Sequence, residues 1–265
     1  MRLISWNVNG RVRVIKEQIT ALKRQRCDIV ALQETTKTTI PIFREGLQRI
    51  GLRYVTDSFQ GVADKTKLVG PRRYGEIIAC HWPLQVLPVD SIDVPWPERI
   101  LSVVIDSPWG NIRFYTTHIP PGVTNGWLKI RMLEGVFEGL ARRSRIPRIL
   151  SGDFNTPREE TRDGRVVTWD KEGTRWDQGE RNVLVGLAEF DLTDVFRYRH
   201  GYKVQEYSWY SRPHIGRRFD HVFASHSLLS NVECRYIHSF REEHLSDHSA
   251  VRVDFAIGQS VRDTA

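Results

Sequence analysis

The sequence predicts an α/β fold in which helices and strands form layers around a core. Two segments carry apolar residues at helical spacing, and ten short apolar segments are typical of strands. Mixed helices and strands of this kind indicate layered packing. The 265 residues are enough for one large domain, because two-sheet sandwiches often reach this size. We expect a single domain over residues 1–258, with a C-terminal tail at 259–265.

The predicted elements follow one another along the whole chain without a linker or a repeat. Apolar residues recurring every three or four positions predict a helix over residues 12–26 and another over residues 127–144. Strands are predicted near residues 2–8, 28–34, 75–81, 99–106, 111–118, 146–152, 206–211, 218–225, 232–238 and 249–256. The stretch 157–182 is dense in charged residues, so we expect an irregular loop that is either solvated or in contact with substrate.

Composition narrows the class of partner and the setting. The formal net charge is +7 and the pI is about 9.5, which favours a polyanionic partner such as nucleic acid. Cys27, Cys80 and Cys234 lie far apart and form no CxxC pattern, so neither a disulfide framework nor a zinc knuckle is predicted. No apolar run is long enough to span a bilayer, and none resembles a signal peptide. We expect a soluble, cytoplasmic monomer with no membrane partner.

The most informative segment is Ser151-Gly-Asp-Phe-Asn155. It directly follows the strand-like run Arg148-Ile-Leu150. Side chains two residues apart share one face of an extended chain, so Asp153 and Asn155 should lie together at the end of that strand. A turn after a strand would also suit either residue alone.

Three further segments place polar side chains at predicted strand ends. They are Ser5-Trp-Asn-Val-Asn-Gly10, Leu32-Gln-Glu34 and Ser246-Asp-His248. A phosphodiester-cleaving metal site needs oxygen ligands for a hard cation, a base for water, and donors for a phosphate oxygen. Together with the Asp153 segment, these three supply each of those groups.

The order WNVNG, LQE, GDFN and SDH resembles the endonuclease/exonuclease/phosphatase superfamily. The resemblance covers the chain from Arg2 to Phe255. It implies the four-layered α/β-sandwich of deoxyribonuclease I, in which two packed, mostly antiparallel sheets are flanked by helices. It also implies a phosphodiesterase that depends on Mg²⁺ or Mn²⁺.

The resemblance assigns a role to each motif residue. Glu34 corresponds to the principal metal ligand, and Asn7 to the residue that supports it. Asp153 corresponds to the group that orients or deprotonates the attacking water, and Asn155 to the group that holds the phosphate. Asp247 corresponds to a contributor to a second or shifted metal position.

Two histidines complete the implied site. Asp220, in Arg218-Phe-Asp-His-Val-Phe-Ala-Ser225, resembles the Asp that hydrogen-bonds the final His of the family, here His248. His118 would bind a phosphate oxygen or protonate the leaving oxygen. Abasic-site endonucleases of the exonuclease III type usually carry Tyr there, so His118 is more like deoxyribonuclease I.

The C-terminal third resembles the exonuclease III branch instead. There an aromatic residue after a Ser lines a pocket for the sugar, and Trp209 is the candidate here, although a core Trp would fit equally well. Arg11, Arg131 and Arg218 are candidate phosphate contacts because they lie near motif residues.

These observations predict a Mg²⁺- or Mn²⁺-dependent nuclease, with DNA as the expected substrate. The same chemistry on an inositol phosphate or phospholipid headgroup is the alternative. A catalytically dead binding module would have lost one of the motif residues, and all of them are present. DNA against RNA, and endonuclease against exonuclease action, are left open by the sequence.

Overall fold

Two six-stranded sheets form the centre of the computed structural model, which describes residues 1–212 and 215–257. The first sheet has the order β15 (Glu233–Ile237), β16 (Ala250–Asp254), β1 (Arg2–Asn7), β2 (Ile29–Thr35), β4 (Gly75–Cys80) and β3 (Tyr54–Asp57). The second has the order β11 (Thr193–Asp194), β14 (Asp220–Ala224), β8 (Arg148–Asp153), β7 (Gly110–His118), β6 (Ile100–Ser107) and β5 (Leu84–Val86). The tail predicted at 259–265 lies outside the described residues.

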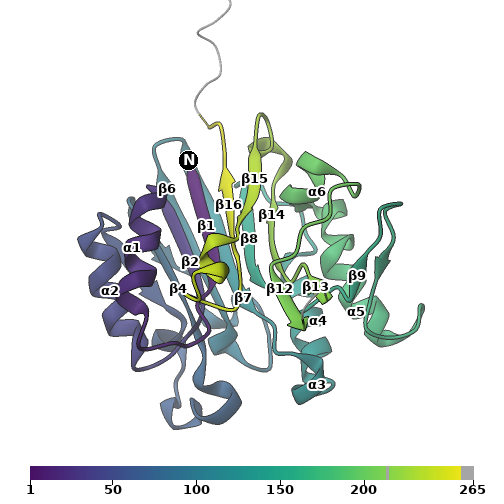
Figure 1. Cartoon of the computed structure of the whole chain (residues 1–265), viewed down its shortest axis with the longest axis horizontal. Helices are drawn as coiled ribbons and strands as arrows, with labels where there is room; N and C mark the ends of the chain where they lie inside the picture. Colours follow the sequence, from purple (N-terminus) through teal and green to yellow (C-terminus); the bar gives the residue numbers. More distant parts are fainter. Residues whose placement is uncertain (213–214, 258–265) are drawn as a thin grey trace, which may run out of the picture.

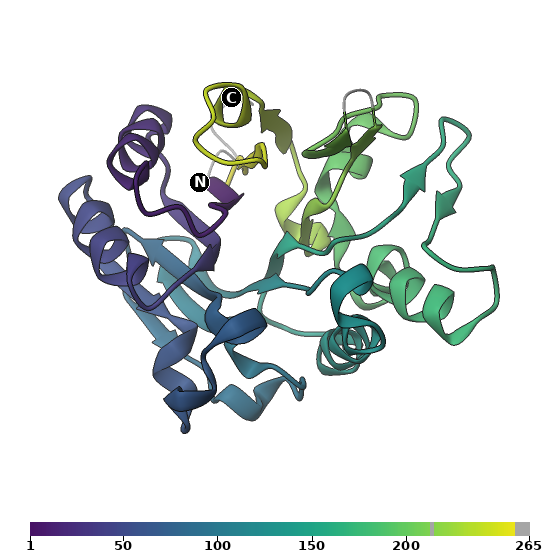
Figure 2. The same ribbon diagram turned by 60° about the horizontal axis from the view of Figure 1, so that its bottom comes forward.

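Helices cover the outer face of each sheet (Figure 1). On the first sheet these are α1 (Ile15–Gln25) and α2 (Thr39–Arg49), and on the second α4 (Leu128–Leu140) and α5 (Arg175–Leu184). Successive side chains of a strand point to opposite faces of the sheet, so each sheet contributes to two hydrophobic cores. Leu3, for example, lies in the core between the sheets, whereas Ile4 packs under α1 and α2. The predicted four-layered α/β-sandwich is therefore confirmed, and Figure 2 shows the same layers from a second direction.

Every predicted strand is present within a few residues of its expected bounds, and both predicted helices are present. Among the described residues, six strands and five helices had no counterpart in the predictions. The strands are β3, β5, β9 (Glu159–Glu160), β10 (Val166–Val167), β11 and β13 (Ile215–Arg217), the last of which pairs with β12 (Trp209–Arg212). The helices are α2, α3 (Gly122–Asn125), α5, α6 (Val195–His200) and α7 (Ser239–Glu242). Short 3₁₀ turns at 58–61, 65–67, 70–73, 89–91, 97–99, 186–190 and 226–228 connect the larger elements.

The stretch 157–182 is more ordered than the predicted irregular loop. It contains the β9–β10 hairpin and most of α5. Thr174 caps α5 by accepting a hydrogen bond from the Asp177 N–H, and Val183 and Leu184 bury its inner face. Most charged residues of this segment precede α5, and within the helix Asp177 and Glu180 are buried and accept hydrogen bonds from Thr168, Trp169 and Trp176, so the charge concealed the helical spacing.

Parallel pairing brings several strand ends to one edge. β1 pairs in parallel with β2, and β7 with β8, while the other pairs of the two large sheets are antiparallel. The carboxyl ends of these four strands carry Asn7, Glu34, His118 and Asp153. Among the described residues, no helix has the length and apolar character needed to cross a bilayer.

Candidate active site

Strand register places Asp153 between two other predicted site residues. On one side β8 pairs with β7 so that Asp153 lies opposite His118, and on the other it pairs with β14 so that Asp153 lies opposite Asp220. Gly152 makes this approach possible. Its φ is +146°, and a Cβ there would lie 1.9 Å from the carbonyl oxygen of Thr117. The glycine that precedes Asp153 is therefore required for the close contact of β7 and β8.

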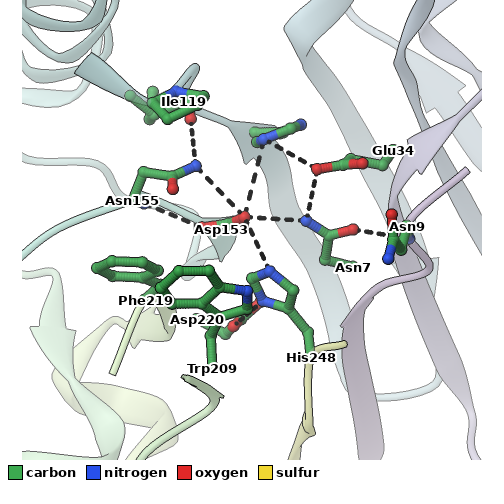
Figure 3. A network of polar contacts seen from close by, with 12 residues as sticks. Asn7, Asn9, Glu34, Ile119, Asp153, Asn155, Trp209, Phe219, Asp220 and His248 are labelled. Atoms are coloured by element: carbon green, nitrogen blue, oxygen red, sulfur yellow. Dashed lines mark hydrogen bonds and ion pairs between the residues drawn. The ribbon is translucent and has the colours of Figure 1, made fainter. Parts of the chain in front are cut away.

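Glu34 reaches the same point from the other sheet. The β2–β4 ladder has an irregularity between Leu32 and Thr35, and Glu34 adopts a left-handed φ of 58°. Such a conformation costs about 1–3 kcal/mol for a non-glycine residue and is common at functional sites. The Asn7 amide donates to both carboxylates, with Nδ2 3.0 Å from Glu34 Oε1 and 2.9 Å from Asp153 Oδ2 (Figure 3).

His248 faces Asp153 from the last loop before β16. Its Nδ1 is 2.7 Å from Asp220 Oδ2, and its Nε2 is 3.8 Å from Asp153 Oδ2. Two backbone contacts fix the loop: the His248 N–H donates to Ser246 Oγ, and Trp6 Nε1 donates to the His248 carbonyl oxygen. Burial alone would lower the pKa of His248, but attraction to Asp220 and Asp153 raises that pKa to about 10. His248 is therefore an imidazolium at neutral pH.

His118 is held in the opposite protonation state. Its Nε2 lies 3.4 Å from Glu34 Oε1 and 3.7 Å from Asp153 Oδ2. The Arg99 guanidinium, itself buried, donates to His118 Nδ1, so the ring proton lies on Nε2 and faces the carboxylates. Burial, with repulsion from Arg99 and His248, holds the pKa of His118 well below its usual value. His118 is therefore a neutral hydrogen-bond donor.

Asn155 borders the same space. Its backbone N–H donates to Asp153 Oδ1 at 2.9 Å, and its φ of 51° is left-handed. The side-chain Nδ2 donates to the Ile119 carbonyl oxygen at 2.9 Å, while its contact to Asp153 Oδ2 is long, at 3.5 Å. The second amide hydrogen therefore has only a weak partner and is the one that an incoming oxygen could accept.

Negative charge exceeds positive charge at this rim. Burial raises the pKa of Glu34 and raises that of Asp153 to about 7. Glu76 is fully buried nearby, and neither of its carboxylate oxygens has a donor among the described residues. Burial raises its pKa well above the ordinary value, an effect that the attraction of Arg99 offsets only in part and to which repulsion from Glu34 and Asp153 adds.

These side chains fit a divalent cation. The ligand atoms of Glu34, His118 and Asp153 lie within 4.8 Å of one another, as do those of Asp153, Asp220 and His248. Closely spaced carboxylate oxygens with raised pKa values are stabilised by a bound cation, and hard cations prefer such oxygens. The donor set therefore suits the metal dependence that is general in this family.

The other predicted contacts lie around this centre. Asp247 is close to Glu34, whose pKa it raises, and it accepts a hydrogen bond from Trp209 Nε1 at 3.1 Å. The Arg11 guanidinium donates to the His244 carbonyl oxygen at 2.7 Å, beside the loop that carries His248. Arg131 is exposed on α4.

Arg218 does not reach the rim, which corrects its prediction as a substrate contact. Its side chain is buried, with Nε 2.6 Å from Glu160 Oε2 and Nη2 2.8 Å from Asp194 Oδ2. Arg197 also pairs with Glu160, and His221 Nδ1 lies 3.0 Å from Asp194 Oδ2. We call these five residues the Arg218 cluster. The Arg218 guanidinium binds the carboxylates of Glu160 and Asp194 inside the protein and does not face the catalytic rim.

Trp209 lies at the site, and its ring stacks on Phe219 with centroids 5.4 Å apart. It also lines an apolar pocket with Trp169 and Trp176. Neither of these tryptophans was among the predicted site residues, nor were Arg99 and Glu76. Glu76 could have been recognised, because it is a lone carboxylate directly before the apolar run Ile77-Ile-Ala-Cys80 in a predicted strand. Arg99 could not, because its role depends on the position of His118.

Comparison with known proteins indicates the same class of enzyme as the residues of the site do. The sequence profile of the Endonuclease/Exonuclease/phosphatase family matches residues 4–248. The chain is similar to the exodeoxyribonuclease of Bacillus subtilis, with 24% identity over 245 residues that cover 88% of this chain and 91% of that protein.

Two solved structures share the fold. An AP endonuclease from Archaeoglobus fulgidus superposes with a TM-score of 0.74 at 21% identity, covering 97% of this chain and all of that chain. A 3′ phosphatase from Neisseria bound to a product DNA hairpin superposes with a TM-score of 0.67 at 20% identity, covering 96% and 99%. The fold and the site define a phosphodiester hydrolase. The chain belongs to the endonuclease/exonuclease/phosphatase family.

Proposed function

We propose that this enzyme is a Mg²⁺- or Mn²⁺-dependent nuclease that hydrolyses phosphodiester bonds in DNA. The observation that carries the proposal is the convergence of Glu34, Asp153, His118 and His248 from both sheets at one point, with more buried carboxylate than nearby cationic charge. Such a centre accepts a cation and, through it, a polyanion.

Asp153 would receive the proton of the attacking water. Its Oδ2 lies 3.8 Å from His248 Nε2 and 3.5 Å from Asn155 Nδ2, so the carboxylate faces the groups that would hold the phosphate and can accept a proton there. Asn7 holds its Oδ2 toward Glu34, so the carboxylate is oriented before substrate arrives. The Asp153 side chain would therefore orient the water and take up its proton.

The two histidines would stabilise the phosphoryl group in different ways. His248 carries a positive charge, which Asp220 holds in place, and would offset the charge that develops on the phosphate oxygens. His118 is neutral and would donate from Nε2 to a phosphate oxygen. This favours the phosphate-binding role of His118 over protonation of the leaving oxygen. Asn155 would contribute its second amide hydrogen.

Glu34 would hold the metal ion, with Asn7 supporting its carboxylate and Asp247 beside it. A bound Mg²⁺ or Mn²⁺ supplies Lewis-acid stabilisation of the phosphate and relieves the repulsion among the carboxylates. Fit to the site does not distinguish the two ions, because both are hard cations with oxygen ligands.

DNA is the proposed substrate for two reasons. The net charge of +7 favours a polyanion. The similar proteins from Bacillus subtilis, Archaeoglobus fulgidus and Neisseria are, by name, an exodeoxyribonuclease, an AP endonuclease and a 3′ phosphatase bound to DNA. A cytoplasmic monomer remains our expectation.

A substrate panel tests the proposal. Labelled single-stranded, double-stranded and abasic DNA, RNA and inositol phosphates are each incubated with Mg²⁺, Mn²⁺ or EDTA. An Asp153→Asn variant purified in parallel controls for contaminating nuclease. We expect metal-dependent cleavage of DNA that the variant lacks. Saturable turnover of an inositol phosphate without DNA cleavage would contradict the proposal.

A further inference from the structure

An aromatic pocket opens beside the catalytic centre, next to Asn155. Its walls are Trp169, Trp176, Trp209 and Phe219, and Lys129 lies in its lining. The pocket has a volume of about 420 Å³, which falls within the ~300–1,000 Å³ range of small-molecule sites. Figure 3 shows two of its rings, Trp209 and Phe219, beside Asp220 and His248.

Hydrogen bonds hold the two indoles that come from the segment 157–182. Trp176 Nε1 donates to Glu180 Oε1 at 2.9 Å, and Trp169 Nε1 donates to the Asn155 carbonyl oxygen at 3.3 Å. Lys129 links these contacts, because its Nζ donates both to Glu180 and, at 2.9 Å, to the same Asn155 carbonyl oxygen. The ammonium also lies 5.9 Å from the centroid of each indole.

This framework ties the pocket to the phosphate-binding residue. The Asn155 carbonyl oxygen accepts from Lys129 and Trp169, while its side chain borders Asp153. Trp209 connects the opposite wall to the catalytic loop through its hydrogen bond to Asp247. A part of the substrate that binds in the pocket would therefore lie next to the phosphate undergoing hydrolysis.

The chemistry of the walls selects the kind of group. Aromatic faces stack on flat rings, and every nucleobase has two such faces. A deoxyribose without its base is small and polar, so it would leave most of the volume empty and most of the indole surface without a partner. The pocket therefore matches a nucleobase with its sugar better than an abasic sugar.

We propose that this pocket binds an intact nucleobase, unstacked from its strand, on a nucleotide adjacent to the scissile phosphate. The proposal rests on the proposed nuclease function and sets its specificity: base-bearing positions are preferred over abasic ones. Trp176 and Trp169 are the specificity-determining residues, because they extend the pocket beyond Trp209 and Phe219.

Binding of two small probes tests the pocket without any hydrolysis. Thymidine 5′-monophosphate and 2-deoxyribose 5-phosphate carry the same phosphate and differ in the base. We expect calorimetry with the intact protein and Mg²⁺ to show roughly ten-fold tighter binding of the nucleotide, as expected for one stacked base. Equal affinity for the two probes, or no binding of either, would overturn the proposal.

Matched variants assign the difference to the pocket. Trp176→Leu should remove the preference for the nucleotide, whereas Trp176→Phe should keep it because a ring remains. Trp109→Leu removes an exposed indole from the β6–β7 turn, which lies at the other end of β7 from His118, and should keep it as well. A preference that survives Trp176→Leu in folded protein would contradict the assignment.

Cleavage of duplexes with a base or an abasic analogue at one defined position separates the two proposals. Cleavage that favours the base-bearing duplex, and loses this preference in Trp176→Leu, supports both. Base-dependent binding of the small probes without cleavage of any DNA would refute the nuclease function and leave the pocket assignment standing. Cleavage that is equal at both positions, or that favours the abasic one, would refute the base-binding pocket alone.

Discussion

Two buried groups of carboxylates lie near each other in this fold and differ in how their charge is matched. In the Arg218 cluster, Glu160 receives two hydrogen bonds from Arg218 and two from Arg197. At the catalytic rim, Glu34 and Asp153 receive hydrogen bonds from the neutral amide of Asn7. In the Arg218 cluster the carboxylate charge is balanced by guanidinium groups, whereas at the catalytic rim the negative charge is not fully balanced.

The pKa values follow from that difference. Burial would raise the pKa of Glu160, but Arg218 and Arg197 lower it to about 2. Burial raises the pKa of Asp153 to about 7, because the attraction of His248 and the hydrogen bond from Asn7 only partly offset burial and the repulsion of Asp220. The comparison teaches that a fully paired buried carboxylate is a structural element, and that an underpaired one is a place for a cation.

The largest effect should follow from removing an underpaired carboxylate. Asp153→Asn or Glu34→Ala should slow DNA hydrolysis roughly 10³-fold or more, since each removes a group that acts in the chemistry. Thermal unfolding without metal should show unchanged or raised stability, because an unmatched buried charge has been removed. Near-wild-type turnover by Asp153→Asn would contradict the assignment.

Removing the paired carboxylate should have the opposite consequence. Glu160→Gln removes the carboxylate that pairs with the buried Arg197 and leaves Arg218 with Asp194 alone, and should cost about 3–5 kcal/mol of folding free energy in urea denaturation. The control is Glu134→Gln, which breaks the solvent-exposed pair with Arg175 and should cost less than about 1 kcal/mol. Equal stability of the two variants would show that the cluster is not structural.

The Arg218 cluster and the catalytic rim should change the folding stability in two separate pH ranges, an acid limb and a limb at higher pH. The pKa of Glu160, about 2, lies below its ordinary value, so its contribution is present above about pH 4.5 and is lost toward pH 2. The pKa values of Asp153, about 7, and His248, about 10, are raised, so their contributions are lost as the pH rises through those values.

Thermal unfolding in EDTA across this pH range measures both limbs. Glu160→Gln should flatten the acid limb only. Asp153→Asn should flatten the loss of stability between about pH 4 and pH 7 and leave the acid limb in place. A single limb that responds equally to both substitutions would mean that the two groups do not titrate independently.

The smallest predicted effect concerns charges at the margin of the site. Arg11→Ala and Arg131→Ala should each lower the salt dependence of DNA binding by about one phosphate, a change of roughly 0.9 in the log–log slope. Binding is measured with an Asp153→Asn background to prevent cleavage. Arg49→Ala, at the C-terminal end of α2, is the control and should leave the slope unchanged. An unaltered slope for Arg11→Ala would exclude that arginine as a phosphate contact.

Much of the catalytic rim could be predicted because three of the four motifs end a strand, and the fourth precedes one. The end of a strand fixes where Asn7, Glu34 and Asp153 lie, whatever surrounds them. Arg218 could not be placed in the same way. Its partners Glu160 and Asp194 lie 58 and 24 residues away, so nearness to Asp220 in the sequence suggested the rim whereas tertiary pairing placed the side chain inside.

The same limit explains the missed pocket. Trp169 and Trp176 lie in a segment whose charged residues indicated an irregular loop, either solvated or in contact with substrate. Only the packing of α5 against α4, with Lys129 between the indoles, turns these residues toward Asn155. Local patterns thus predicted the residues at strand ends, and long-range packing determined which other side chains meet them.

Binding of a divalent cation tests the central claim most directly, because the claim is that the underpaired carboxylates form a cation site. Calorimetric titration with Mn²⁺ compares the wild-type enzyme with Glu34→Gln and with the exposed-pair control Glu134→Gln. We predict saturable binding by the wild type and the control, and at least ten-fold weaker binding by Glu34→Gln, in parallel with its loss of DNA hydrolysis. Undiminished binding by Glu34→Gln, or hydrolysis of DNA by the wild type in EDTA, would contradict the account.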